Sequence, residues 1–343
     1  MKKKNRKGRR IAFLILLFTA IVCIIVGALI YDYVSMPYEG VKTRVYVDAS
    51  EGEDALRDSL AAHLGDNYAS RVFKVWGKMS DIAELQSGSY LVEPGEKAWQ
   101  LARRIKNRRQ NPVNVTFNNL RTMGQLVVRL DRQLLADSAS IACAIDSMLS
   151  SQGVDARNYA THFLPDTYEF YWTESPDKVI KKITDHYTAF WTDDRLKKAE
   201  ALHLTPAQVS TLASIVEEET NKADERPKVA RLYLNRLAKG MKLQADPTVK
   251  FAVGDFTLTR ILNKHLSVNS PYNTYIHAGL PPGPIRLPQA STLDAVLNAP
   301  QHNYIYMCAK EDFSGYHNFA SDYAAHQANA KRYRDALDRN GYR

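Results

Sequence analysis

A run of twenty residues without a single charge, 11–30, constrains this 343-residue chain more than any other feature. It follows ten residues that carry seven lysines and arginines and no acidic side chain. Twenty apolar residues are long enough to cross a bilayer as one helix, and positively charged flanks stay on the cytoplasmic side. The sequence therefore predicts a cytoplasmic tail at 1–10, a single transmembrane helix at 11–31, and everything beyond it outside the cytoplasm.

A cleaved signal peptide is the alternative explanation for this start. The apolar core of a signal peptide is usually about 7–15 residues long and ends near a small-residue cleavage site. The run at 11–30 is longer, and no convincing site of that kind follows it. A retained anchor is therefore the better prediction, with 32–43 as a linker.

Most of the positive net charge comes from the N-terminal tail. The whole chain carries +9, but without the seven tail cations 39 basic residues face 37 acidic ones, which leaves +2. Binding to nucleic acid is therefore not supported. We expect no metal and no cofactor, because the sequence has no Cys/His cluster at metal-ligand spacing and no Gly-rich phosphate loop.

Three cysteines do not define a disulfide framework. Cys23 lies in the apolar run, so only Cys143 and Cys308 could pair in an oxidising compartment. Two free buried thiols explain these residues equally well, and the sequence leaves the pairing open.

A weak internal repeat follows the linker. Its copies, each a strand and then a helix, are 44–48 with 50–64, 89–92 with 93–108 and, more faintly, 113–117 with 122–135. The first two copies share Gly-Glu-x-Ala-Leu/Trp, beginning at Gly52 and Gly95. A strand, a glycine turn and a short helix resemble carbohydrate-binding modules of the LysM type. Tyr90 and Trp99 could stack on sugar rings, although a place in the core is the commoner explanation for a single aromatic residue.

Three consecutive glutamates lie near the end of a later predicted helix, in Ser-Ile-Val-Glu-Glu-Glu-Thr at 214–220. Thr205, Pro206 and Gln208 supply its N-cap, first-turn proline and capping box. Apolar residues then recur at helical spacing, at Val209, Leu212, Ala213, Ile215 and Val216.

Helix geometry separates the three glutamates. At about 100° per residue, Glu219 falls roughly 50° from the centre of the apolar stripe, Glu217 about 110° and Glu218 about 150°. A carboxylate on an apolar face loses hydration, so its pKa rises and it can hold a proton near neutral pH. Glu219 is therefore the candidate general acid, although a solvated face is the commoner explanation for such a run.

Downstream of these glutamates, the sequence predicts one more helix and three polar loops. Asp224 is expected to cap a helix that runs to Lys239. Its buried stripe should contain Val229, Leu232, Tyr233 and Leu237. The loops are Leu-Gln-Ala-Asp-Pro-Thr-Val at 243–249, Ser-Pro-Tyr-Asn-Thr-Tyr at 270–275 and Gly-Leu-Pro-Pro-Gly-Pro-Ile at 279–285. Such loops suit a groove for hydroxylated, uncharged rings, and they suit ordinary loop architecture as well.

These motifs, together with Leu-Pro-Asp-Thr-Tyr at 164–168 and the late His317-Asn318-Phe319 and His326, occur in the order and approximate spacing of a known family. Over nearly its whole length the chain resembles the endolytic murein transglycosylases, the MltG or YceG-like family. The resemblance implies a lyase of bacterial peptidoglycan. Such a protein is anchored in the cytoplasmic (inner) membrane by one pass, with its catalytic domain on the periplasmic or extracytoplasmic side.

The resemblance also implies roles for individual residues. The catalytic glutamate of the family directly precedes the threonine of its Glu-x-Glu-Thr motif, which is Glu219 here. Glu217 matches the first glutamate and is expected to support the site. The family often has lysine where this chain has Glu218, and an extra negative charge there would raise the pKa of the acid further.

The predicted fold class is α+β. We expect LysM-like βαα glycan-binding subdomains at 44–136, a connecting region of helix and loop at 137–200, and a mixed α+β catalytic domain at 201–343. Gln244, Asp246, Tyr272 and Asn273 are candidates for orienting the sugar or Glu219, although buried hydrogen bonds explain them nearly as well. His317 and His326 are expected to be structural.

The predicted reaction needs only one carboxylate. Protonated Glu219 would donate to the oxygen between MurNAc and GlcNAc, and the C6 hydroxyl of the same MurNAc would close onto C1. Asp246 is the competitor: if it shares the groove with Glu219, simple hydrolysis returns as an option.

A membrane-anchored glycan-binding scaffold without turnover is the alternative function. An anchored enzyme that ends the elongation of nascent strands would meet glycan polymerases and division proteins, but no residue identifies them.

Overall fold

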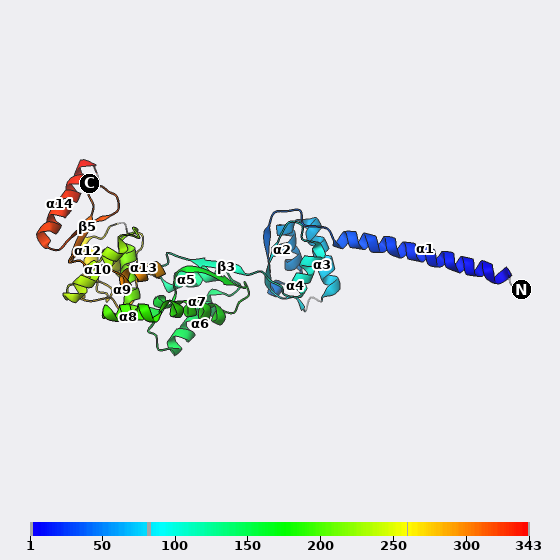
Figure 1. The fold of residues 1–343 in the computed structure, drawn as a ribbon, viewed down its shortest axis with the longest axis horizontal. Helices are drawn as coiled ribbons and strands as arrows, with labels where there is room; N and C mark the ends of the chain where they lie inside the picture. The colour runs from blue at the N-terminus through cyan, green and yellow to red at the C-terminus, as the bar shows by residue number, and fades with distance from the viewer. Residues whose placement is uncertain (1–2, 81–83, 259, 342–343) are drawn as a thin grey trace. The chain divides into compact units, whose positions relative to one another are not determined.

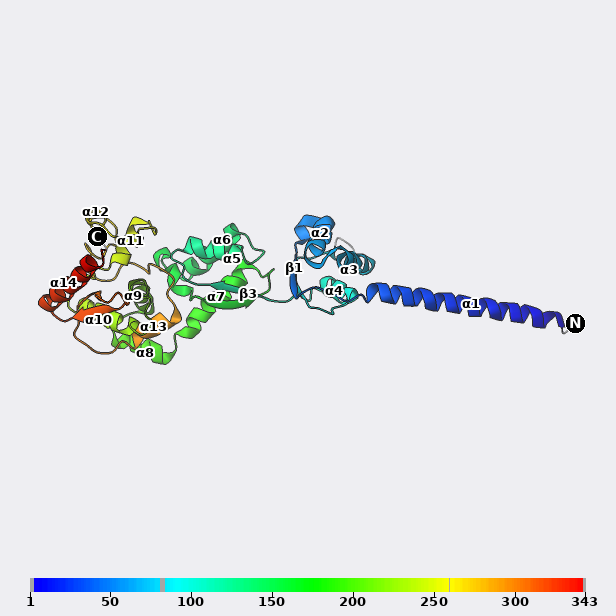
Figure 2. The ribbon, with the colours of Figure 1, turned by 90° about the horizontal axis from the view of Figure 1, so that it is seen from above.

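The computed structural model describes residues 3–80, 84–258 and 260–341, with helices and short two-stranded sheets throughout (Figures 1 and 2). The chain divides into two compact units. Unit 1 comprises Met1–Val113 with Glu169–Thr173, and unit 2 comprises Asn114–Tyr168 with Glu174–Arg343. The mixture of helix and antiparallel strand confirms the predicted α+β class.

Helix α1, Lys3–Val34, begins unit 1 and is blue in Figure 1. Residues 1–2 of the predicted tail lie outside the described residues. The segment Lys7–Val34 is long and apolar enough to cross a bilayer, and no part of its most apolar window is buried by protein. Leu16 and Ile24, for example, are each 70% exposed. The helix predicted at 11–31 is therefore present, with an apolar surface that the described parts of the protein leave uncovered.

The remainder of unit 1 is built around one antiparallel strand pair. Its elements are β1 Thr43–Val47, α2 Gly52–Leu64, α3 Asp66–Met79, β2 Gly88–Val92 and α4 Ala98–Lys106. Strand β1 pairs with β2 from Thr43 opposite Val92 to Val47 opposite Gly88. Apolar side chains from both strands and all three helices meet in one core. The first two copies of the predicted repeat are thus confirmed as a strand followed by a helix.

Tyr90 occupies this core rather than a binding surface. It is 0% exposed, and its hydroxyl donates to the carbonyl oxygen of Ile105 at 3.4 Å. The suggestion that Tyr90 stacks on a sugar ring is therefore wrong, because no face of the ring reaches solvent. Trp99 is half-buried.

Unit 2 contains most of the helices. The boundary between the two units falls within strands β3 and β4. The elements of unit 2 are β3 Val113–Phe117, α5 Met123–Asp131, α6 Ser138–Ser151, β4 Asp166–Phe170, α7 Pro176–Phe190, α8 Asp193–Ala201, α9 Pro206–Glu219, α10 Arg226–Ala238, α11 Asp246–Val253, α12 Asn263–Leu266, α13 Ala290–Leu297, β5 Tyr306–Ala309, β6 His317–Ala320 and α14 Tyr323–Arg339. Strand β3 pairs with β4, and β5 pairs with β6 as an antiparallel hairpin. The third strand–helix copy is confirmed as β3 and α5.

Several local predictions for unit 2 are corrected. The motif 164–168, whose polar residues by themselves suggest a turn or a helix start, runs into strand β4. The predicted polar loop at 243–249 ends in helix α11, because Asp246 and Pro247 form a favourable first turn. Asp224 does not cap α10; Glu225 is the N-cap residue, and the Asp224 carboxylate accepts a hydrogen bond from the Tyr316 hydroxyl instead.

The cysteines are free in the described structure. Cys143 is exposed and Cys308 is half-buried. The disulfide that the sequence left open is therefore absent here, and the alternative of two buried thiols is wrong for Cys143.

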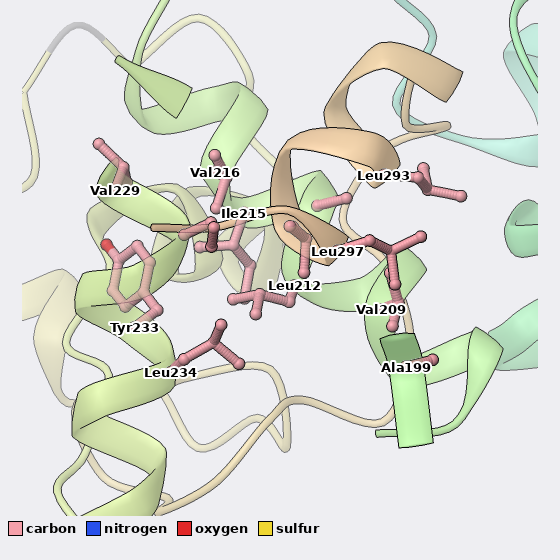
Figure 3. Close-up of a cluster of buried hydrophobic side chains, with 14 of the residues drawn as sticks. Ala199, Val209, Leu212, Ile215, Val216, Val229, Tyr233, Leu234, Leu293 and Leu297 are labelled. Carbon is pink, nitrogen blue, oxygen red and sulfur yellow. The ribbon is translucent and has the colours of Figure 1, made fainter. Parts of the chain in front are cut away.

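Helix α9 lies at the centre of the core of unit 2. It starts as predicted, since the Thr205 N–H donates to the Gln208 side chain at 2.8 Å and the Gln208 N–H donates to the Thr205 hydroxyl at 3.3 Å. However, every residue from 209 to 217 is buried. Helices α10 and α13 pack on it from different sides, with α8 and α11 adding further contacts (Figure 3). The solvated face, which was the alternative explanation for the glutamate run, is absent over 209–217, so α9 is a central helix and not an amphipathic surface helix.

We expect Leu212→Ala to lower the free energy of unfolding by about 2–5 kcal/mol, because Leu212 is 0% exposed and its truncation leaves a cavity in the core. The matched control is Leu196→Ala on α8, where the side chain is 41% exposed and the change should be within about 0.5 kcal/mol. Chemical denaturation of the detergent-solubilised chain measures both. Equal losses would contradict the central position of α9.

Candidate active site

The three glutamates at the end of α9 have three different surroundings. Glu217 is buried, with its side chain 1% exposed, and it lies 3.0 Å from the Arg286 guanidinium as an ion pair. Its other oxygen accepts hydrogen bonds from the Gln289 N–H at 2.9 Å and the Thr292 hydroxyl at 2.8 Å. Glu217 therefore ties α9 to the start of α13.

Glu218 is bound by two arginines. Arg286 Nη1 donates to one carboxylate oxygen and Arg121 Nη2 to the other, both at 2.9 Å. Arg286 is buried and also donates to the Asn119 side chain at 2.9 Å. The negative charges of Glu217 and Glu218 are thus compensated by cations, and the end of α9 is fastened to residues 119–121 and 286.

Glu219 has no such compensation. Its one hydrogen bond is accepted from the Tyr233 hydroxyl at 2.7 Å, and among the residues described no cation lies within ion-pair distance. Burial raises the pKa of Glu219 to about 7, and the charges of Asp246 and Glu218 act in the same direction. The Tyr233 hydrogen bond opposes this rise. The expected direction of the shift and its main cause, lost hydration, are both confirmed.

Glu219 faces a cavity of about 400 Å³. That volume lies within the range of about 300–1,000 Å³ found for ligand pockets. The wall is formed by the ends of α9 and α10, the segment that leads into α11 with its first residue, the loop at 270–275, the β5–β6 hairpin and the start of α14. Its residues are Glu219, Tyr233, Arg236, Gln244, Asp246, Tyr275, Tyr306, Met307, Cys308, Ala309, His317, Tyr323 and His326.

Two of the predicted supporting residues line this cavity. Asp246 begins α11 and accepts a hydrogen bond from the Tyr275 hydroxyl at 2.6 Å. Gln244 lies just before it, and its side-chain oxygen accepts from Arg236 Nη2 at 2.7 Å. Asp246 therefore shares the cavity with Glu219, which is the condition under which hydrolysis becomes an option.

The other three predicted supporting residues lie outside the lining of this cavity. Glu217 is enclosed by its ion pair, as described above. Asn273 is 0% exposed, and its amide donates to the carbonyl oxygens of Leu266 and Val268, each at 2.9 Å. The Tyr272 ring packs against Phe251 with 4.7 Å between ring centroids. For Tyr272 and Asn273 the structure favours the packing role that the sequence had left open, whereas Glu217, expected to support the site, lies outside the cavity lining.

His317 is part of the cavity wall and is also firmly held. Its Nδ1 lies 2.8 Å from one oxygen of the Glu225 carboxylate, and its main-chain N–H donates to the other at 2.8 Å. Glu225 also accepts from the hydroxyl of Thr220, the residue after Glu219, at 3.1 Å. Thus one buried carboxylate joins the end of α9 to the β5–β6 hairpin.

Sequence reasoning missed much of the wall. Tyr233 and Arg236 are three residues apart on α10, so they share a face, but helical spacing alone assigned Tyr233 to the core stripe. Figure 3 shows why both descriptions apply: the Tyr233 ring packs in the apolar cluster and its hydroxyl lies at the edge. For Tyr306 and His326 no local signal exists, because the hairpin and α14 bring them to the cavity from far along the chain.

The model of the YceG-like family matches residues 45–332. The chain belongs to the YceG-like family. A YceG-like protein of Listeria monocytogenes has a similar structure, with a TM-score of 0.57 and 24% identity, covering 84% of this chain and 98% of that one. At that identity the likeness concerns the fold alone.

Relatives that the chain matches in sequence carry the name endolytic murein transglycosylase. The protein of Bacillus subtilis (strain 168) is 36% identical over 158 residues, which is 44% of this chain and 42% of that protein. The protein of Streptococcus pneumoniae serotype 2 (strain D39 / NCTC 7466) is 23% identical over 281 residues, covering 69% of this chain and 49% of that protein. The YceG-like chain described here thus aligns with less than half the length of each relative.

We predict that Tyr233→Phe raises the pKa of Glu219 above about 7, because the variant loses the hydrogen bond that favours the ionised carboxylate. The pKa can be followed through the carboxyl stretching band in infrared difference spectra. Tyr323→Phe is the control, since Tyr323 lines the same cavity without a hydrogen bond to Glu219 in the described structure. An unchanged pKa in Tyr233→Phe would contradict the proposed coupling.

Proposed function

We propose that this chain is a membrane-anchored endolytic lytic transglycosylase of nascent peptidoglycan, which ends strand elongation by cutting between MurNAc and GlcNAc. The observation that carries the proposal is a carboxyl group, Glu219, with a pKa of about 7 on the wall of a ligand-sized cavity. A general acid works best when its pKa lies near the operating pH. Membership of the YceG-like family and the names of the relatives support the same reaction class.

The mechanism follows from this single acid. Protonated Glu219 donates its proton to the oxygen that links MurNAc to GlcNAc, and the C1–O bond breaks through an oxocarbenium-like state. The C6 hydroxyl of the same MurNAc then attacks C1. The ionised Glu219 accepts the proton of that hydroxyl, so the product carries a 1,6-anhydro end and the acid is restored. The Tyr233 hydroxyl stabilises the ionised form between the two steps.

The position of Asp246 raises the question of whether the C6 hydroxyl or a water molecule attacks C1 of MurNAc. As a second carboxylate on the same cavity wall it could activate a water molecule, which would give a reducing MurNAc end by hydrolysis. In the proposed reaction its charge instead raises the pKa of Glu219 and favours the cationic transition state. Mass spectrometry of the new chain ends separates the two, because an anhydro end is lighter than a reducing end by one water.

We expect Glu219→Gln to keep the fold and to lower the release of anhydro-ended fragments from purified glycan strands by at least about 10²–10⁴-fold. Glutamine has nearly the shape of the acid but no proton to donate. Glu200→Gln, at an exposed position on α8, is the control and should be fully active. Undiminished release by Glu219→Gln would end the proposal, and binding of strands by the wild-type chain without any turnover would favour a scaffold instead.

We propose that the strand–helix–helix–strand part of unit 1 is a LysM-like glycan-binding subdomain, within the region 44–136. The antiparallel pairing of β1 with β2 and the two helices between them support this proposal. Residues 137–200 then connect it to a catalytic domain at 201–343, which contributes every residue of the cavity wall.

The proposed placement is a single pass with the N-terminus in the cytoplasm. The seven cations of the tail precede the apolar segment of α1, which is the charge distribution of an inside end. The substrate would then meet the catalytic domain on the periplasmic or extracytoplasmic face. Because the catalytic domain would lie next to the membrane where new strands are made, glycan polymerases and division proteins remain predicted partners.

The exposed thiol of Cys143 offers a test of this orientation. A membrane-impermeant maleimide should label the wild-type chain in intact cells, and Cys143→Ser should remove most of that label. In a chain lacking Cys23, Cys143 and Cys308, a single cysteine introduced as Lys4→Cys should react only after the membrane is permeabilised. Labelling of Lys4→Cys in intact cells would show that the N-terminus lies outside the cytoplasm and would contradict the proposed orientation.

A further inference from the structure

Arg236 is a buried cation on the wall of the cavity that Glu219 faces. It is 8% exposed and lies in the last turn of α10. Within the described ranges, no carboxylate lies at ion-pair distance from its guanidinium. A buried charge is unfavourable unless it is paired and hydrogen-bonded. The protein therefore leaves the charge of Arg236 only partly compensated. Burial accordingly lowers its pKa.

The guanidinium has five N–H donors, and the protein uses few of them. Nη2 donates to the side-chain oxygen of Gln244 at 2.7 Å. Nε is fully buried without a hydrogen-bond partner in the part of the chain that the structure describes. The Tyr306 ring, 5.9 Å away, contributes an aromatic face and no acceptor group. Arg236 therefore retains donor capacity beside the cavity.

Gln244 is presented to the cavity by an unusual backbone conformation. Its φ is +52°, in the left-handed region, which a residue other than glycine or asparagine seldom adopts. The Gln244 N–H donates to the Thr274 carbonyl at 3.1 Å, which helps to hold the backbone there. Because the amide oxygen accepts from Arg236, the amide NH₂ group remains as a donor toward the cavity.

We propose that Arg236 and Gln244 together form a subsite for the carbonyl oxygen of an acylamino group on a bound sugar. An acyl oxygen is an acceptor only, which matches the remaining N–H donors that Arg236 and Gln244 contribute to this part of the wall. A neutral carbonyl is favoured over a carboxylate, because Glu219 and Asp246 lie on the same cavity wall and would repel an anion. The inference rests on the proposed function, since glycan strands supply such groups.

Two sources of this carbonyl exist on a peptidoglycan strand. Each ring carries a 2-acetamido group, and each MurNAc ring also carries a lactyl group whose carbonyl joins the stem peptide. Both present the same oxygen chemistry. We assign the acetamido carbonyl because it is the group present on every ring, and the substrates below separate it from the lactyl one.

The test is a cycle between variant and substrate, using the full chain in detergent. The kcat/KM for fragment release is measured on native strands, on strands freed of stem peptide by an amidase, and on strands with their N-acetyl groups removed. On native strands Arg236→Gln should lose on the order of 100-fold, because its partner carbonyl becomes unpaired. On de-N-acetylated strands, which the wild-type chain should already cleave poorly, the same variant should lose less than about threefold.

The outcomes of the cycle are distinct. Non-additive losses on de-N-acetylated strands support the acetamido carbonyl. Because the amidase converts the lactyl amide into a carboxylate, a loss that is undiminished on de-N-acetylated strands but changes on peptide-free strands supports the lactyl group within the same subsite. An equal loss on all three substrates would overturn the inference, since it would mean that Arg236 acts only on the protein. Gln244→Asn is the second variant. Gln244 is exposed and asparagine tolerates the left-handed backbone, so this variant tests the subsite without disturbing the core.

A binding measurement keeps this inference separable from the reaction. Glu219→Gln should bind an oligomer of N-acetylglucosamine at least about tenfold more tightly than the matching glucosamine oligomer. Adding Arg236→Gln should remove that preference, and a preference that persists would overturn the subsite. If the wild-type chain releases no fragment from any strand, the proposed reaction fails, while this titration still decides the role of Arg236.

Discussion

Arg286 is the side chain on which the geometry of the site depends. It is 9% exposed and contacts both Glu217 and Glu218, while Arg121 takes the remaining oxygen of Glu218. Removing one member of such a buried ion pair typically destabilises a protein by about 3–5 kcal/mol, because the other charge is left without compensation. The cluster therefore fixes the last turn of α9 in one orientation. It also separates the surroundings of the three glutamates: the first two have arginines as partners, whereas Glu219 has none, and burial raises its pKa to about 7.

The burial of α9 on all sides makes this cluster necessary. A helix without a solvated face must end with its polar groups satisfied inside the protein. Glu217 meets this requirement through Arg286 and the start of α13, and Thr220 does so through Glu225. Glu225 in turn holds His317. The end of the central helix, the start of α10 and the β5–β6 hairpin are thus joined by side chains that surround the residue facing the cavity.

The cavity itself combines opposing charges with hydroxyl groups. Glu219 and Asp246 supply acids, Arg236 supplies a cation, and Tyr233 and Tyr275 each donate to one of the acids. This distribution suits a neutral, hydroxyl-rich ligand whose reaction develops positive charge. The negative charge of the acids stabilises a cationic transition state, and the arginine can donate a hydrogen bond to an acceptor group of the ligand. The Asp246 charge also contributes to the raised pKa of Glu219, after the larger effect of burial.

Local signals in the sequence were sufficient to predict the apolar helix at the N-terminus, the strand–helix copies, the start of α9 and the raised pKa of Glu219, whose catalytic role stays a prediction. Each depends on spacing or capping over a few residues, and such short-range patterns survive in any tertiary context. The Ser-Ile-Val-Glu-Glu-Glu-Thr motif and its companions also sufficed to predict the family. Tertiary structure alone decided that α9 is buried all round, that Glu217 and Glu218 are neutralised by Arg286 and Arg121, and that Tyr306, His317 and His326 reach the cavity. Those arrangements join residues separated by tens of positions, and a side chain on a helix carries no local mark of the distant partner that packs against it.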